Sequence, residues 1–183
     1  MSVRLSPRAL GLSPRALGLS AALIALTLDQ AHKFWMLNVY DIAERQPVTV
    51  APFLDLLLSW NYGVSYSLFP AHEGLGRAAL LAAQALIVSA LAIWMIRAHS
   101  RLTGLALGLV IGGALGNAVD RVMRGAVADF FYLHTSLPVG PLANYVFNVA
   151  DVFITAGVAL LLYESLFLPP PAQTKAETSS SRH

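Results

Sequence analysis

The chain has 183 residues, of which 56% are hydrophobic and 12% are charged, a balance typical of membrane proteins and not of soluble domains. Twelve basic and ten acidic residues give a formal charge of +2, but the basic residues are scattered and form no patch of the kind that binds nucleic acid. The lack of Cys excludes disulfides and a cysteine nucleophile, and the five His never occur at zinc-protease spacing, so no metal or organic cofactor is expected.

Four stretches are apolar and long enough to cross a membrane, which takes about 20 residues of helix. They cover residues 16–37, 75–96, 102–119 and 146–168. The predicted fold is a membrane all-α protein with four transmembrane helices and a small β-sheet or loop element on its outer surface. One membrane domain would then span 16–168, between a cytoplasmic amino-terminal arm (1–15) and a disordered cytoplasmic tail (169–183).

The first predicted span carries two charged residues, Asp29 and Lys33. It begins like a secretory signal but has no convincing cleavage site, so it is interpreted as an uncleaved anchor. At four residues apart the two side chains share one helix face, where they can pair with each other or anchor a neighbouring backbone. A structural ion pair and a part in the chemistry are both compatible with this pattern.

The segment between the first two spans mixes β-branched and aromatic residues with Pro, Gly and Asn, most clearly over 47–69. This composition predicts short strands and turns, within an outer element covering about 38–74. Its large apolar side chains suit either the lipid headgroup level or packing against the helices, and the sequence leaves both possibilities open. These side chains are Phe53, Leu54, Leu56, Leu57 and Trp60.

The third predicted span has glycines at steps of four, which favours close helix packing. They are Gly104, Gly108, Gly112 and Gly116. At its outer end Asn117, Asp120 and Arg121 share one face. This polar cluster is compatible either with a helix terminus whose groups satisfy one another or with substrate contact.

The distribution of charge predicts the orientation, because short cytoplasmic loops are enriched in Lys and Arg. Basic residues occur in the arm, in the 97–101 loop and in the tail, so both termini are expected in the cytoplasm. Eight of the ten acids then lie on or near the outer side, where the chemistry is expected. Glu164, near the inner end of the fourth span, is interpreted as a snorkelling interface residue.

Two aspartates near the outer ends of the last two spans could carry chemistry. Asp129 follows the third span, and Asp151 lies three residues after Asn148 at the start of the fourth, with no basic neighbour in sequence. If the two carboxyl groups meet, repulsion raises one pKa and gives an ionised base beside a neutral acid, which can activate water against an amide. The same acids could instead serve a proton- or cation-coupled transporter, or the bundle could be a non-catalytic scaffold.

Four segments resemble, in order and spacing, the signature motifs of bacterial lipoprotein signal peptidases (signal peptidase II). They are DQAHK (29–33), NYGVSYS (61–67), GGALGNAVDRVMRGAVADF (112–130) and FNVAD (147–151). The resemblance covers 16–168 and implies an aspartyl endopeptidase of the bacterial inner membrane with a periplasm-facing site. Such an enzyme removes the signal peptide from diacylglyceryl-modified prolipoproteins by cutting before the lipidated cysteine.

The resemblance also implies which residues form the site. The catalytic pair maps to Asp129 and Asp151. Supporting positions map to Asp29, Lys33, Asn61, Gly63, Asn117, Asp120, Arg121 and Asn148. The implied partners are the lipid-modified prolipoprotein, membrane lipids and, as inhibitors, cyclic peptide antibiotics of the globomycin type.

Three features depart from the family pattern. Tyr66 stands where Phe is more common, Ala128 replaces a commoner branched residue, and 131–146 is predicted to be a Pro-rich loop. The rival functions fit less well. Serine proteases would need a Gly-x-Ser-x-Gly setting, and transporters commonly have paired repeats and interrupted helices at midplane, whereas the acids here cluster at one end.

Overall fold

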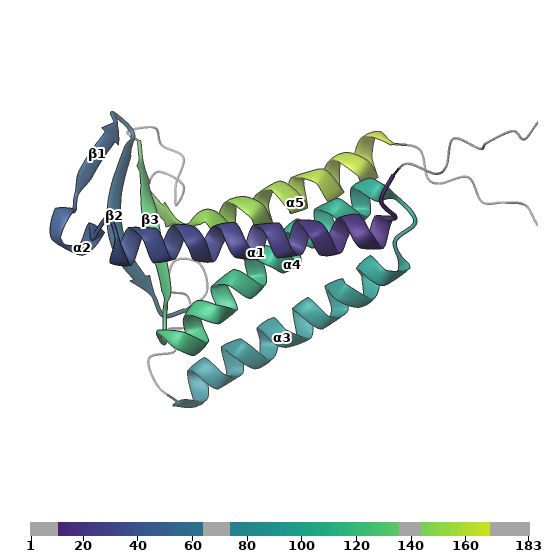
Figure 1. Cartoon of the computed structure of the whole chain (residues 1–183), viewed down its shortest axis with the longest axis horizontal. Coiled ribbons are helices and arrows are strands. Elements are labelled where there is room, and N and C mark those ends of the chain that lie inside the picture. Colours follow the sequence, from purple (N-terminus) through teal and green to yellow (C-terminus); the bar gives the residue numbers. More distant parts are fainter. Residues whose placement is uncertain (1–10, 64–73, 136–143, 169–183) are drawn as a thin grey trace, which may run out of the picture.

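The computed structural model describes residues 11–63, 74–135 and 144–168. Within these residues, four long helices run side by side and an antiparallel sheet closes one end of the bundle (Figure 1). The helices are α1 (Pro14–Asn38), α2 (Ile42–Arg45), α3 (Gly74–Arg97), α4 (Arg101–Met123) and α5 (Val149–Phe167). The strands are β1 (Val48–Ala51), β2 (Leu54–Asn61), β3 (Val127–His134) and β4 (Asn144–Phe147). The predicted tail (169–183), the first ten residues of the arm and Tyr66 lie outside the described residues.

Side-chain caps fix where three of the helices begin. Ser13 accepts a hydrogen bond from the Ala16 amide at the start of α1, and Ser100 accepts bonds from the first amides of α4. Asn148 caps α5 together with Asp151, and each side chain accepts a hydrogen bond from the other residue's backbone N–H. These caps satisfy amides that have no partner inside the helix.

Among the described helices, three are long and apolar enough to cross a membrane: Leu75–Arg97, Arg101–Met123 and Val149–Phe167. They correspond to the predicted second, third and fourth spans. α1 has 25 residues, enough length for a span, but it is the least apolar of the four long helices, and it carries Asp29 and Lys33. Length and composition therefore support three spans.

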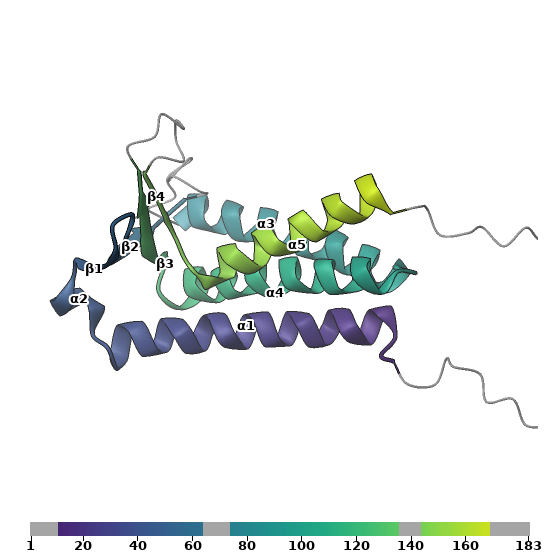
Figure 2. The ribbon, with the colours of Figure 1, turned by 90° about the horizontal axis from the view of Figure 1, so that it is seen from above.

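The central helix is α4, which packs against α1, α3 and α5. Its glycines at steps of four lie directly against α1, which runs parallel to it (Figure 2). A Cβ at these positions would strike a carbonyl oxygen of α1: Gly104 faces Pro14, Gly108 faces Gly18 and Gly112 faces Ala22. The predicted packing role of the glycine stripe is confirmed, and it sets the two helix backbones in contact over most of their length.

The sheet has the order β1-β2-β3-β4, and all its neighbouring strands are antiparallel. The predicted strands within 47–69 are present as β1 and β2. The prediction of a loop over 131–146 is wrong at both ends, because residues up to Leu133 pair with β2 and residues from Asn144 pair back onto β3. The fourth helix therefore starts at Val149 and not at 146. Strand pairing between distant segments supplies the hydrogen bonds that keep 144–147 out of the helix.

The structure also divides the apolar side chains of the outer element between two environments. Leu56 packs against a buried cluster of Met36, Ile42, Ala128 and Phe130 at the end of α1. Phe53 and Trp60 are 55% and 38% exposed. The sheet is thus fixed to the bundle by one set of side chains and presents another set outward.

Candidate active site

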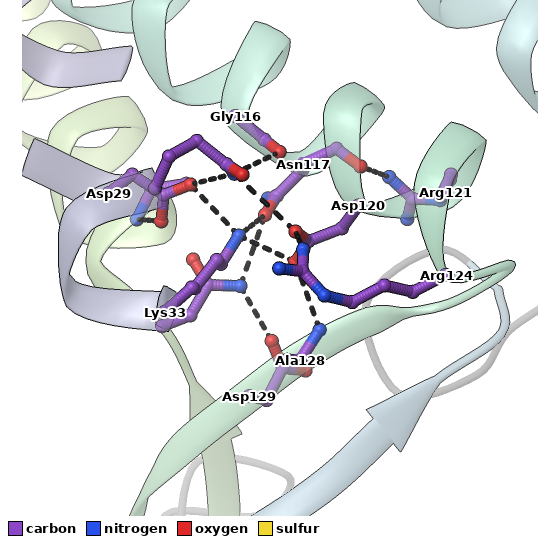
Figure 3. A network of polar contacts seen from close by, with 12 residues as sticks. Asp29, Lys33, Gly116, Asn117, Asp120, Arg121, Arg124, Ala128 and Asp129 are labelled. Carbon is purple, nitrogen blue, oxygen red and sulfur yellow. Dashed lines mark hydrogen bonds and ion pairs between the residues drawn. The ribbon is translucent and has the colours of Figure 1, made fainter. Parts of the chain in front are cut away.

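The ten site residues predicted from the sequence converge where α1, α4 and α5 meet the sheet. Figure 3 shows the part of this site around Lys33, with Asp29, Asn117, Asp120, Arg121 and Asp129. They come from α1 (Asp29, Lys33), from β2 and the residues after it (Asn61, Gly63), from α4 (Asn117, Asp120, Arg121), from β3 (Asp129) and from the start of α5 (Asn148, Asp151). Hydrogen bonds and ion pairs connect all ten into one network.

The ammonium group of Lys33 is the centre of this network and is fully buried. Its Nζ lies 2.9 Å from Asp29 Oδ2, 2.9 Å from Asp120 Oδ2 and 3.1 Å from Asn117 Oδ1. Three acceptors match the three N–H donors of an ammonium group. Burial of these charges is tolerable only because each is paired, and removing one would leave the others without compensation.

Asp29 connects the ammonium group to the start of α5. While Oδ2 pairs with Lys33, Oδ1 accepts a hydrogen bond of 2.9 Å from the backbone N–H of Ala150. Both arrangements predicted for Asp29, an ion pair and a backbone anchor, therefore occur together. A carboxylate at a helix N-terminus is also favoured by the helix dipole. Asp29 thus fixes α5 at the turn that carries Asp151.

Asp120 has the corresponding role for β3. Its Oδ2 accepts a hydrogen bond of 3.1 Å from the backbone N–H of Ala128, the residue before Asp129, and it also pairs with Lys33. Its other oxygen, Oδ1, pairs with Arg124. The carboxylate therefore holds the strand beside the position from which the Asp129 side chain projects.

Two amide side chains hold the two remaining aspartates. Asn117 turns its Oδ1 toward Lys33, so its Nδ2 must face away, and it donates to Asp151 Oδ1 at 3.0 Å. Asn148 donates from Nδ2 to Asp129 Oδ1 at 2.6 Å and to Asn117 Oδ1 at 3.1 Å. The buried ammonium thereby sets the orientation of both amides, and the amides set the positions of the carboxyl groups.

Asp129 is 3% exposed and lies near a second acid. Burial, and then the charge of Asp151, raise the pKa of Asp129 to about 7, although hydrogen bonds from Asn148 and Asn61 oppose the shift. At neutral pH this carboxyl group therefore exchanges readily between its protonated and ionised forms. A pKa near the working pH is what general acid and base catalysis requires.

Asp129 and Asp151 line the same cavity, which has a volume of about 420 Å³. Its polar end also includes Asn61, Asn117 and Arg121. The rest is apolar and lies between α3 on one side and α4 and α5 on the other, with Leu80, Ile87, Val88, Leu91, Val110 and Ile154 in its walls. The cavity can therefore hold a polar reacting group and a long apolar group side by side.

Arg121 crosses the polar end of the cavity. Its Nη2 donates to the Gly63 carbonyl at 2.6 Å, and its Nη1 lies 3.4 Å from Gln84 Oε1. Its buried Nε has no hydrogen-bond partner among the described residues. The guanidinium group thus connects α4 to the chain that follows β2 and to α3.

Sequence reasoning missed three polar residues of the site. Gln30 donates to Asp29, to the Gly116 carbonyl and to Asp120; Gln84 binds the Ala114 carbonyl and Arg121; Arg124 pairs with Asp120. Amide side chains within apolar helices were a signal available for the two glutamines. Across the described chain, no group of acids and His could hold a metal ion.

The comparisons with known proteins agree on one family. A family model described as signal peptidase (SPase) II matches residues 21–167. The lipoprotein signal peptidase of Beijerinckia indica subsp. indica is 51% identical over 161 residues, which cover 88% of this chain and 90% of the relative. That of Nitrobacter hamburgensis is 50% identical over 153 residues, covering 84% and 93%.

Two solved structures, described as bacterial membrane enzymes determined by the in meso method, share the fold. Each superposes with a TM-score of 0.67, at 24% and 25% sequence identity. They cover 85% and 83% of this chain, and the superposed part is 93% and 94% of theirs.

Proposed function

The chain belongs to the signal peptidase II family, and we propose that Asp129 and Asp151 form its catalytic pair. Family membership makes the protein a membrane-bound aspartic endopeptidase that removes the signal peptide from lipid-modified prolipoproteins. The transporter hypothesis is not supported. The observation that carries the proposed pair is that both carboxyl groups line one cavity, each hydrogen-bonded by an asparagine of the buried network.

The proposed chemistry is activation of water between the two carboxyl groups. One ionised aspartate takes a proton from the water as its oxygen attacks the carbonyl carbon before the modified cysteine. The other, protonated, donates to the carbonyl oxygen, giving a neutral tetrahedral intermediate. Collapse of that intermediate breaks the C–N bond: the first carboxyl group gives its proton to the amine nitrogen, and the second, now ionised, takes a proton from one of the two hydroxyl groups, so both return to their starting states. The pKa of Asp129 at about 7 supports this division, because one of the pair can carry the proton at neutral pH.

The lining of the cavity supports a position for the substrate. We propose that the diacylglyceryl group lies among Leu80, Ile87, Val88 and Leu91 of α3 and that the peptide crosses the polar end near Arg121. Apolar walls stabilise acyl chains by removing them from polar surroundings. Cyclic peptide antibiotics of the globomycin type would compete for the same polar end.

We also propose that α1 is a fourth span and that 16–168 forms one peptidase domain in the bacterial inner membrane. The glycines of α4 follow α1 from Pro14 to Asp29, which supports a common path through the bilayer. Arg97 and Arg101 lie at the end opposite the aspartates, which supports cytoplasmic termini (arm 1–15, tail 169–183) and a site facing the periplasm.

The test is cleavage of a lipid-modified prolipoprotein by the purified full chain. Asp129→Asn and Asp151→Asn should each bind the substrate but lose nearly all cleavage, because Asn can neither accept nor donate the transferred proton. Asp55→Asn is the matched control: this aspartate lies on the adjacent strand β2 and pairs with His134, away from the cavity, and cleavage should persist. Substantial cleavage by either site variant, in folded protein, would refute the proposed pair.

A further inference from the structure

A second cavity, of about 630 Å³, lies between α3 and α5 at the end of the bundle remote from the aspartates. Its walls include Trp94 and Arg97 from α3, Thr103 from α4 and Glu164 from α5. It exists because, in the described chain, α3 and α5 each pack on α4 but scarcely on each other. This cavity has no part in the site described above.

Glu164 is an acid within a helix that is long and apolar enough to span the membrane. Its Oε2 accepts a hydrogen bond of 2.7 Å from the Thr103 hydroxyl, which fixes the carboxyl group on the cavity wall. No basic residue in the described parts of the chain forms an ion pair with it. A carboxylate at membrane depth costs several kcal/mol unless it is paired or hydrated. A positive group that enters the cavity could therefore pair with this carboxylate.

The facing wall carries the opposite charge without a partner. Arg97, in the last turn of α3, forms no ion pair with any described residue. The nearby Arg101 does not line the cavity, since its guanidinium group lies against Gly11, which precedes α1. The cavity thus presents one unpaired cation on α3 and one unpaired anion on α5, with open space between them.

We propose that this cavity binds the headgroup of a phospholipid with a primary ammonium group, of the phosphoethanolamine type, with its phosphate at Arg97 and its ammonium at Glu164. A zwitterion of this kind supplies both missing charges in one molecule. Membrane lipid is the source because the cavity lies at the ends of three spanning helices, beside Trp94, which is 50% exposed. Tryptophan is enriched at this depth of the bilayer.

The chemistry of the two walls discriminates among headgroups. A primary ammonium can donate hydrogen bonds to the Glu164 carboxylate, whereas the trimethylammonium of phosphocholine has no N–H to donate. A phosphoglycerol headgroup has no positive charge at all. Acyl chains would follow the exposed apolar faces of α3 and α5, where Ile93 and Leu162 are 51% and 56% exposed. The proposal does not depend on which residues cleave the peptide.

Trp94 gives a direct measurement. In the full chain with Trp35→Phe and Trp60→Phe, the remaining tryptophan lies in the cavity wall. Its fluorescence is measured in detergent micelles during titration with phospholipids brominated near the headgroup end of their acyl chains. Phosphatidylethanolamine should reach half-maximal quenching at a concentration about tenfold lower than phosphatidylcholine or phosphatidylglycerol with the same chains, since a charge-assisted hydrogen bond is gained.

Three variants locate the effect. Glu164→Gln should abolish the advantage of phosphatidylethanolamine over phosphatidylcholine, and Arg97→Gln should weaken the binding of both. Arg45→Gln, at the sheet end where Arg45 lies over the Tyr40 ring, should change neither. Stepwise N-methylation of phosphatidylethanolamine repeats the test on the unaltered cavity, and each methyl group should raise the half-quenching concentration. Equal quenching by all three lipids, or a preference that survives Glu164→Gln, would overturn the proposal.

Discussion

Replacing Asp129 by Asn should make the protein more stable at alkaline pH while removing its activity. Asp129 is 3% exposed, and its burial and the nearby charge of Asp151 raise its pKa to about 7. An acid whose pKa is raised by folding holds its proton more tightly in the folded state than in the unfolded state. Folding stability therefore falls as pH rises from the unfolded pKa toward 7. An Asn side chain does not titrate and escapes this loss.

The magnitude follows from the two pKa values. With 3.8 for the unfolded chain and about 7 for the folded chain, the ionised Asp129 costs about 4 kcal/mol at pH 8 and about 2 kcal/mol at pH 5. The Asn side chain would also lose the hydrogen bond from Asn61, worth about 1 kcal/mol at either pH. Subtracting the two pH values removes that constant loss. The advantage of Asp129→Asn over the wild type should thus grow by about 2 to 3 kcal/mol between pH 5 and pH 8.

The assay is thermal unfolding of the purified proteins in detergent across this pH range. For a chain of this size the predicted change corresponds to a difference in Tm that grows by about 5 to 10 °C. Asp41→Asn is the control, since Asp41 is exposed and makes no cap hydrogen bond, and its Tm should follow the wild type at every pH. The same Tm difference between Asp129→Asn and the wild type at pH 5 and pH 8 would refute the reasoning.

Further predictions concern the rest of the site, the helix contact and the topology. The double variant Asp129→Asn, Asp151→Asn should be no slower than either single variant, because the pair acts as a unit; multiplied losses of cleavage rate would argue for separate roles. Lys33→Met should lower the free energy of unfolding by about 3 to 5 kcal/mol, because it leaves the buried carboxylates of Asp29 and Asp120 without their cation. A free energy of chemical unfolding and a cleavage rate equal to those of the wild type would show the ion pairs to be incidental. Gly108→Ala should destabilise by about 1 to 3 kcal/mol, since its Cβ would strike the Gly18 carbonyl, whereas Leu115→Ala on the exposed side should cost less; the reverse order in a melting experiment would contradict the close packing of α1 on α4. Reporter fusions after residues 99 and 170 should report cytoplasm and those after 45 and 135 periplasm; a periplasmic carboxyl terminus would exclude the four-span topology.

Local features of the sequence determined a large part of this protein. The apolar runs of α3, α4 and α5 are long enough to identify these segments as membrane helices without knowledge of their packing, because a segment that crosses the hydrocarbon core must be apolar and of sufficient length. Gly108 and the other glycines spaced four residues apart in α4 predict a close helix contact, since only small residues let two backbones approach. Acids and amides at the ends of apolar segments are conspicuous because their burial is costly, so residues such as Asp29, Asn117 and Asp151 could be singled out in advance. Asn61 and Gly63, and the division of roles, came only from the family resemblance.

The tertiary structure alone decided how these pieces meet. The pairing of β3 with β2 and β4 depends on segments far apart in the chain, so a segment that looks like a loop supplies two strands and the start of α5 moves to Val149. Gln30 and Gln84 join the site only because α1 and α3 lie against α4. Asp120 holds Ala128 beside Asp129 only because β3 lies against the end of α4. Sequence spacing fixes which side chains share a helix face, but hydrogen bonds between elements, and the shifted pKa that burial produces at Asp129, arise only when those faces are packed together.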